Sequence, residues 1–187
     1  KRGDYKPYVF KTGNRGKSWE PIANDLPERG SAHTIPGDHV HPDLLFVGTE
    51  FGLFFTQDGG DSWHKMTGNF PTIAVRDLEI QERESDLVVG TFGRSIYILD
   101  DYSPLRTDER SLKNNEATFF PVKDAWLYIE NDSNFDSNGA ELFVSENPPF
   151  GAVLSYYLRD GVKTLKQQRR GKERKLELAR GDTPYPS

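Results

Sequence analysis

Short apolar segments alternate with polar, glycine-containing turns along the first hundred residues of the chain. Each segment carries either alternating or continuous apolar positions, which is the pattern of half-buried or buried β-strands. We therefore predict strands at residues 8–11, 20–22, 44–49, 52–56, 64–66, 75–81, 87–91 and 95–100.

The pattern changes after residue 101. Residues 102–117 are polar and contain no strand pattern, so we predict a linker there. Residues 118–130 predict one or two further strands, and residues 151–160 predict another. Residues 163–180 favour a charged helix that Gly171 interrupts, and its few leucines form no apolar stripe, so we expect it to be solvated.

Two sequence patterns repeat with nearly the same period. Trp19 and Trp63 end similar segments and lie 44 residues apart, while the Gly-Thr pairs at Gly48 and Gly90 lie 42 residues apart. A period in the low forties, built of short strands and turns, is typical of β-propeller blades.

These patterns together predict an all-β fold with two parts. Residues 1–105 would form a partial propeller of about two to three four-stranded antiparallel blades. Residues 106–187 would form the linker and the beginning of a β-rich, sandwich-like segment with a charged, helical tail. Closed propellers have about four to eight blades, so we expect the remaining blades of a larger parent chain, or oligomeric copies, to cover the open edges.

The repeated segments share the pattern Ser/Thr-x-Asp-x-Gly-x-Ser/Thr-Trp. An Asp or Asn side chain can accept hydrogen bonds from nearby backbone N–H groups and close a tight turn, and glycine supplies a positive φ. The tryptophan can then fold back beside its sheet and bury about 150–250 Å². Asn14 replaces the usual Asp, which preserves the acceptor but removes any acidic role. The residues that fit the pattern are Thr12, Asn14, Gly16, Ser18 and Trp19, and Thr56, Asp58, Gly60, Ser62 and Trp63.

This motif resembles the Asp-box, or BNR repeat, of sialidases, sortilins and related propellers. The stretches "HPDLLFVGTEFGLFFTQDGGDSW" and "LVVGTFGRSIYILDDYSPL" resemble the last blades of large bacterial proteins described as sortilin-like or as BNR-repeat glycosyl hydrolases. The stretch "ENPPFGAVLSYYLRD" is similar to the start of the β-sandwich that follows those blades. The resemblance covers most of residues 5–160.

The resemblance implies that the Asp-box residues are structural and lie away from the mouth of the propeller. It also implies a non-catalytic binding or scaffolding module for a protein, peptide or glycan, in an extracytoplasmic (periplasmic or secreted) location. The alternative is part of a sialidase- or xyloglucanase-like glycoside hydrolase with most of its catalytic acids outside this chain. Fold analogy alone does not decide between the two.

A glycosidase needs two carboxyl groups about 5–5.5 Å or 6.5–9.5 Å apart. Arg76, Asp77 and Arg94 are our candidates for a polar group lining the propeller channel, and a structural salt bridge is the alternative that we favour. The acids considered are Asp43, Glu50, Asp77, Glu79, Asp100 and Asp101.

The sequence contains two weak indications of metal binding. His39 and His41 would lie on one side of a strand, with His33 or His64 as a further ligand. Asn134–Gly139 is similar to a calcium loop, but Ser145 stands where that loop requires Glu. We favour solvated loops in both places and expect no metal and no cofactor.

Composition and charge exclude or disfavour several further kinds of site and classes of protein. The chain has no cysteine, so disulfides and thiolate metal sites are excluded. Its net charge is −5, although eight Lys or Arg and only two Glu lie between Gly161 and Arg180. An acidic body argues against general nucleic-acid binding, and we interpret the basic run at 166–175 as a solvated surface rather than an anion-binding patch. No apolar run approaches the length of about 18 residues that a membrane span needs. Because the chain starts at Lys1 and has a single methionine, Met66, we expect either a fragment of a longer protein or a processed product.

Overall fold

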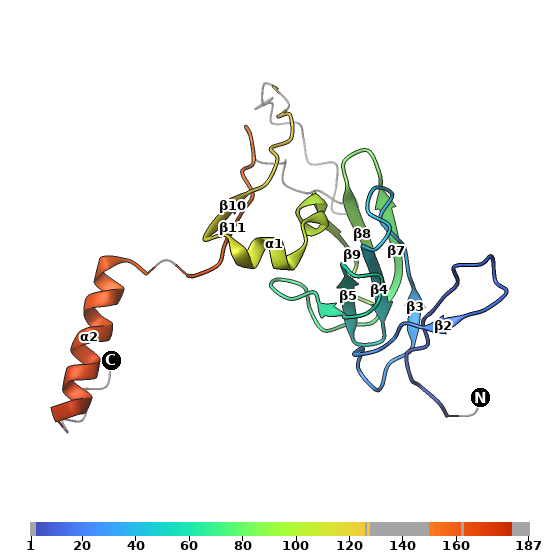
Figure 1. Ribbon diagram of the computed structural model, residues 1–187, viewed down its shortest axis with the longest axis horizontal. Helices are drawn as coiled ribbons and strands as arrows, with labels where there is room; N and C mark the ends of the chain where they lie inside the picture. The colour runs from blue at the N-terminus through green and yellow to red at the C-terminus, as the bar shows by residue number, and fades with distance from the viewer. Residues whose placement is uncertain (1–2, 126, 128–149, 162, 181–187) are drawn as a thin grey trace, which may run out of the picture. The chain divides into compact units, whose positions relative to one another are not determined.

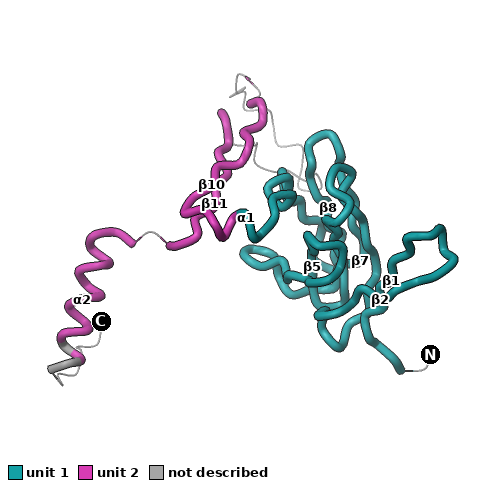
Figure 2. Tube along the Cα trace, in the orientation of Figure 1, with its two compact units in different colours: residues 1–111 teal, residues 112–187 magenta. Residues whose placement is uncertain are grey.

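A computed structural model describes residues 3–125, 127, 150–161 and 163–180 of the chain (Figure 1). The chain divides into two compact units, Lys1–Ser111 and Leu112–Ser187 (Figure 2). The described residues form eleven strands, and every pairing between them is antiparallel. The fold is therefore all-β, as the sequence pattern predicted.

The first unit contains three sheets in which the strands follow chain order. The two-stranded sheet contains β1 (Phe10–Lys11) and β2 (Glu20–Pro21). The four-stranded sheet contains β3 (Ala32–Thr34), β4 (Leu45–Thr49), β5 (Gly52–Thr56) and β6 (His64–Lys65). The three-stranded sheet contains β7 (Val75–Gln81), β8 (Asp86–Thr91) and β9 (Ile96–Leu99).

The eight strands predicted within the first hundred residues are confirmed, whereas β3 was not predicted. The segment Ala32–Thr34 has no large apolar side chain and therefore no recognisable strand pattern. It becomes a strand because it pairs with β4, opposite Thr49 and Gly48, across an irregularity in the register.

The four-stranded sheet is buried on both faces. The first core lies between it and the β1–β2 sheet, and the second core lies between it and the β7–β9 sheet. The first core consists of Val9, Ile22, Leu26, Val47, Phe54 and Trp63. The second core consists of Leu44, Phe46, Leu53, Val75, Leu78, Leu87, Val89 and Tyr102. Burial of both faces explains why β4 and β5 show continuous apolar runs rather than alternation.

A glycine permits the close contact between β4 and β7. A Cβ atom added to Gly48 would lie 2.6 Å from Val75 Cγ1, closer than real Cβ contacts come. The corresponding position of the three-stranded sheet, Gly90, has more room, because the nearest atom to an added Cβ would be Asp77 Cβ at 3.5 Å.

The predicted linker at residues 102–117 is wrong for its first part. Tyr102 is fully buried in the second core and is followed by the 3₁₀-helix η1 (Ser103–Arg106), in which Leu105 packs against the same core. Proline early in η1 favours the helical turn because its φ is fixed at a helical value. The helix α1 (Glu109–Asn114) follows, and a strand begins at Ala117.

The second unit contains a short antiparallel pair and a helix. β10 (Ala117–Phe119) lies partly within the predicted segment 118–130, and β11 (Tyr156–Leu158) is shorter than the predicted 151–160. The helix α2 (Leu165–Arg180) confirms the predicted charged helix, but it continues through Gly171. One glycine costs only about 1 kcal/mol, and most of its neighbours are strong helix formers.

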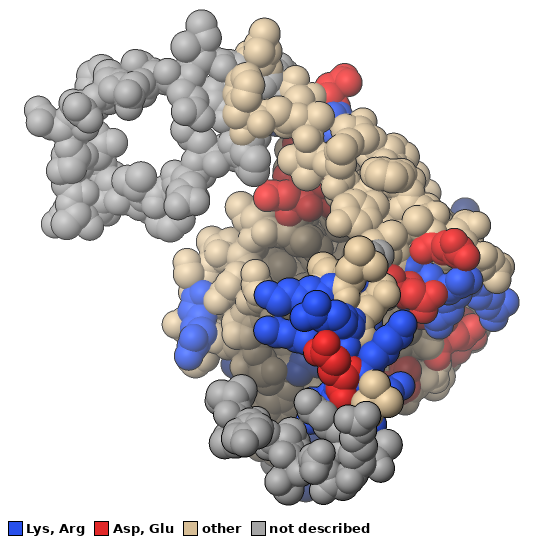
Figure 3. Space-filling model, turned by 90° about the vertical axis from the view of Figure 1, so that its left-hand side faces the viewer, with Lys and Arg blue, Asp and Glu red and all other residues tan. Residues whose placement is uncertain are grey.

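The α2 helix carries an exposed ion pair between Arg169 and Glu173 at 3.2 Å. Basic side chains gather over it in Figure 3. Neither this helix nor any other helix among the described residues is long and apolar enough to cross a membrane.

Candidate functional site

The segment Thr56–Trp63, which we call turn 2, joins β5 to β6 and is closed by side chains. The Thr56 hydroxyl donates to Asp58 Oδ1 at 2.6 Å and accepts the Gly60 N–H at 3.1 Å. Asp58 Oδ1 also accepts the Ser62 N–H at 2.9 Å, and Oδ2 accepts the Ser62 hydroxyl at 2.5 Å. Partial burial raises the pKa of Asp58, but the hydrogen bonds from Ser62 and Thr56 outweigh it and lower that pKa to about 2. Asp58 is therefore an ionised acceptor that holds the turn.

The segment Thr12–Trp19, which we call turn 1, repeats this arrangement with an amide. The Thr12 hydroxyl accepts the Gly16 N–H at 2.9 Å, and Asn14 Oδ1 accepts the Ser18 N–H at 2.9 Å. Asn14 Nδ2 donates to the Ser18 hydroxyl at 2.7 Å, so the bond runs in the direction opposite to the one in turn 2. The Asp58 carboxylate and the Asn14 amide therefore close turns of the same kind.

The two tryptophans that end these turns differ in burial. Trp63 is 6% exposed, its Nε1–H donates to the Ile22 carbonyl at 2.7 Å, and its backbone N–H donates to Asp25 at 2.8 Å. Trp19 is 60% exposed, so the expectation that it buries beside its sheet is wrong for this residue. The reason is that the indole of Trp63 fits between two sheets, whereas no described sheet packs on the outer face of β1 and β2.

Among the described residues, Asp38 has the carboxyl group whose pKa is shifted furthest, and the sequence did not point to this residue. Asp38 accepts Arg106 Nε at 2.9 Å and Nη2 at 2.8 Å, the Tyr102 hydroxyl at 2.6 Å and the His41 N–H at 2.7 Å. Arg106 also donates to the Ser85 hydroxyl at 3.0 Å. We call Asp38, Ser85, Tyr102 and Arg106 the Asp38 network.

The Asp38 network is a structural clamp rather than a reaction centre. Burial raises the pKa of Asp38, but the bonds from Arg106 and Tyr102 outweigh this effect and hold the pKa well below its usual range. Burial is the largest cause that raises the pKa of Tyr102, and its hydrogen bond to Asp38 raises it further. The Asp38 side chain is 0% exposed and its oxygens are occupied, so a substrate has no access to it. Sequence reasoning missed the clamp because nothing in the local sequence links residues 38 and 106.

A partly exposed polar cluster lies at the other end of the sheets. His33 Nε2 lies 3.0 Å from Glu50 Oε2 and 3.1 Å from Arg76 Nη1, and Arg76 Nη2 lies 3.7 Å from Glu50 Oε1. The Arg76 guanidinium also lies over the Phe92 ring, 5.2 Å from its centroid. We call His33, Glu50, Arg76 and Phe92 the His33 cluster.

The topology explains why these four residues meet. His33 and Arg76 come from β3 and β7, which contact each other directly. Glu50 and Phe92 come from the turns that follow β4 and β8. Turn 2 follows the opposite end of β5, so the His33 cluster and turn 2 lie at opposite ends of the four-stranded sheet.

The structure does not bring the three predicted channel residues together. Arg76 lies in the His33 cluster, but Asp77 Oδ1 accepts the N–H of its neighbour Leu78 at 3.0 Å. Arg94 is exposed and makes no hydrogen bond or ion pair with any residue that the structure describes.

Two other acids considered from the sequence have a cationic or a hydroxyl partner. Asp43 lies 3.8 Å from Lys11 Nζ, and Asp101 accepts the Ser103 hydroxyl at 2.6 Å. The described residues contain no group of three or more His, Asp or Glu side chains that could hold a metal ion. His39 instead lies 3.5 Å from Asp38, and the calcium-like segment Asn134–Gly139 lies outside the described residues.

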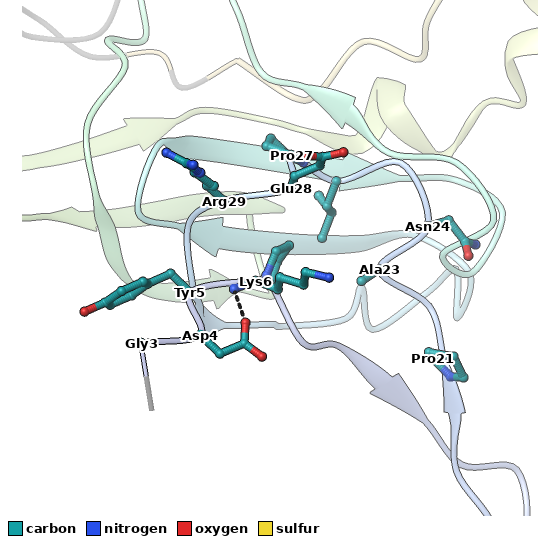
Figure 4. Close-up of a pocket in the computed structure, with 12 residues that line it drawn as sticks. Gly3, Asp4, Tyr5, Lys6, Pro21, Ala23, Asn24, Pro27, Glu28 and Arg29 are labelled. Carbon is teal, nitrogen blue, oxygen red and sulfur yellow. Dashed lines mark hydrogen bonds between the residues drawn. The ribbon is translucent and has the colours of Figure 1, made fainter. Parts of the chain in front are cut away.

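A shallow pocket lies between the N-terminal segment and the residues that follow β2 (Figure 4). Its charged lining residues are of both signs, and the Asp4 carboxylate accepts the Lys6 N–H at 3.2 Å. The Tyr8 hydroxyl also donates to Asp4 and lowers the pKa of that carboxyl. None of the predicted site residues lines this pocket. The lining residues are Gly3, Asp4, Tyr5, Lys6, Pro7, Pro21, Ala23, Asn24, Leu26, Pro27, Glu28 and Arg29.

The His33 cluster is therefore the site whose exposure and side-chain chemistry best suit an external ligand. Comparison of the sequence with models of protein families gave no match, and comparison with curated proteins gave none either.

Proposed function

We propose that the chain is part of a sortilin-like Asp-box β-propeller and serves as a non-catalytic binding or scaffolding module for a protein, peptide or glycan. The ligand would bind at the His33 cluster. The observation that carries this proposal is the combination of an exposed arginine, a carboxylate and an aromatic ring at one end of two adjacent sheets.

Three features support the propeller part of the proposal. Antiparallel sheets follow one another in chain order and pack face to face. The first strands of the two larger sheets, β3 and β7, contact each other, as the innermost strands of neighbouring blades do around a central channel. Turns 1 and 2 share a hydrogen-bonding scheme and recur at blade spacing.

The His33 cluster offers two kinds of contact to a ligand. Because one ring nitrogen of His33 lies between Glu50 and Arg76, it can serve only one of them as a hydrogen-bond partner at a time. Whichever of Glu50 and Arg76 is not bonded to His33 can form a hydrogen bond with a ligand hydroxyl, amide or carboxylate. Phe92, which is exposed, adds an apolar surface for a sugar ring or an aromatic side chain.

The same geometry favours binding over hydrolysis. The partners of Glu50 among the described residues are His33 and Arg76, not a second carboxyl group. The acid pair that a glycosidase needs would therefore have to come from residues outside the cluster.

The test is a screen of the full 187-residue chain against peptide and glycan arrays, followed by affinity measurements on the variants Arg76→Ala and Phe92→Ala. We expect each to weaken binding at least about tenfold, which corresponds to about 1.4 kcal/mol. Arg83→Ala is the matched control, because Arg83 is an exposed arginine at the other end of the β7–β8 hairpin.

Equal affinities in all four proteins would remove the His33 cluster as the site. Release of product from a bound glycan would instead support the hydrolase alternative.

A further inference from the structure

Because of the internal repeat, strands of one sheet have equivalent strands in the next sheet. Phe10 and Trp19 correspond to Phe54 and Trp63, 44 residues later. In the other direction, Leu53 lies opposite Gly48 and Ile96 lies opposite Gly90, so Leu53 and Ile96 correspond.

The outer face of the β1–β2 sheet is exposed where its counterpart is buried. Phe54 and Trp63 are 5% and 6% exposed in the first core, whereas Phe10 is 50% exposed and Trp19 is 60% exposed. Tyr8 extends this apolar surface, since its ring stacks parallel to that of Phe10 with centroids 6.4 Å apart. We call Tyr8, Phe10 and Trp19 the N-terminal face.

The outer face of the β7–β9 sheet shows the same contrast. Leu53 is 1% exposed in the second core, but its counterpart Ile96 is 65% exposed. Ile98 is also exposed, and it lies opposite Val88 on the same side of the sheet. We call Val88, Ile96 and Ile98 the C-terminal face.

The first core shows how two such faces fit. In it, Phe54 of β5 and Trp63, which precedes β6, share one cluster with Val9 and Ile22, the residues that directly precede β1 and follow β2. Val9 corresponds to Leu53 in the repeat, and therefore also to Ile96. The N-terminal face and the C-terminal face are thus the two sides of an interface that the chain already makes within itself.

We infer that the N-terminal face of one copy of the chain packs against the C-terminal face of a second copy, with Phe10 and Ile96 taking the places that Phe54 and Val9 hold in the first core. The interface is head-to-tail, because each copy contributes a different face. Such contacts close a ring or continue as an open series. The first unit has three sheets, so the first units of two copies would place six sheets in a ring, within the range of about four to eight blades for closed propellers.

This inference goes beyond the proposed function, because it needs no ligand and does not involve the His33 cluster. It is tested by sedimentation velocity on the full chain between about 1 and 200 μM. We expect assemblies at the upper concentrations, as dimers if the ring closes and as longer series if it does not. Ile96→Asp and Phe10→Asp should each weaken the association at least about tenfold. Leu165→Asp, a change of the same kind at an exposed leucine of α2, should leave it unaltered.

Mixing the two variants tests the head-to-tail geometry itself. The Ile96→Asp chain keeps its N-terminal face and the Phe10→Asp chain keeps its C-terminal face, so an equimolar mixture should form one interface and stop at a dimer. Far-UV circular dichroism of each variant checks that the fold is retained, as expected for exposed positions. A monomeric unaltered chain at 200 μM, a mixture that stays monomeric, or equal loss with Leu165→Asp would overturn the inference.

Discussion

Replacing each of the two turn tryptophans by alanine should have very different effects on stability. Trp63 fills the first core and is 6% exposed, whereas Trp19 is 60% exposed. We expect Trp63→Ala to lower the free energy of unfolding by several kcal/mol and Trp19→Ala to change it by less than about 1 kcal/mol.

The magnitude for Trp63 follows from its contacts. An indole buries about 200 Å², which at about 25 cal/mol per Å² contributes about 5 kcal/mol. Measured losses for Trp or Phe to Ala in cores are about 3–5 kcal/mol. The change also removes the Nε1–H donor of the Ile22 carbonyl, and a buried acceptor left without its donor costs about 1–3 kcal/mol. Trp63→Phe keeps most of the ring and loses the donor, so it should fall between the alanine variant and the unaltered chain.

The assay is urea unfolding followed by far-UV circular dichroism, because removal of a tryptophan changes the fluorescence signal. Protein concentrations near 1 μM keep the contribution of self-association small. Equal losses for Trp19→Ala and Trp63→Ala would refute the reasoning that burial between two sheets, rather than the turn motif itself, makes Trp63 stabilising.

Three further variants test the turn, the sheet packing and the clamp by the same unfolding assay. Asp58→Asn should cost no more than about 1 kcal/mol, because Asn14 closes turn 1 by the same bonds. Folding lowers the pKa of Asp58 from 3.8 to about 2, so its negative charge stabilises the fold at pH values above the unfolded pKa. This contribution to the free energy of unfolding is lost as the pH falls through about 2. The Asn variant should lack this part of the pH dependence of stability. Gly48→Ala should cost about 1–3 kcal/mol by overpacking against β7, whereas Gly90→Ala, the matched control, should cost less; equal costs would contradict the packing argument. Arg106→Ala should cost about 3–5 kcal/mol because it leaves Asp38 buried and unpaired, and combining it with Asp38→Asn should cost less than the sum of the two single changes.

The strands of the first unit could be predicted because their patterns are local. β4 and β5 lie between two cores, and that position selects apolar side chains at successive positions. β3 could not be predicted, since Ala32, His33 and Thr34 are extended by pairing with β4 rather than by their own preferences.

The candidate site was only partly predictable. Arg76 was selected from the sequence as a polar residue near the start of a strand, but its partners come from the neighbouring sheet and from a turn. The Asp38 network joins residues 68 positions apart, and only the folded chain brings them together. Trp19 shows the converse, because a correct local motif does not determine whether a neighbouring sheet covers its tryptophan.

The contacts made by the residues that follow β9 have a mechanical consequence. Gln57 Nε2 donates to the carbonyls of Leu105 and Thr107 at 2.5 and 2.9 Å, and Arg106 grips Asp38 in the loop before β4. A pulling force applied to the chain beyond Thr107 would load these attachments first. β9 would separate from β8 only after these contacts had broken. They therefore protect this edge strand from a force transmitted along its own backbone.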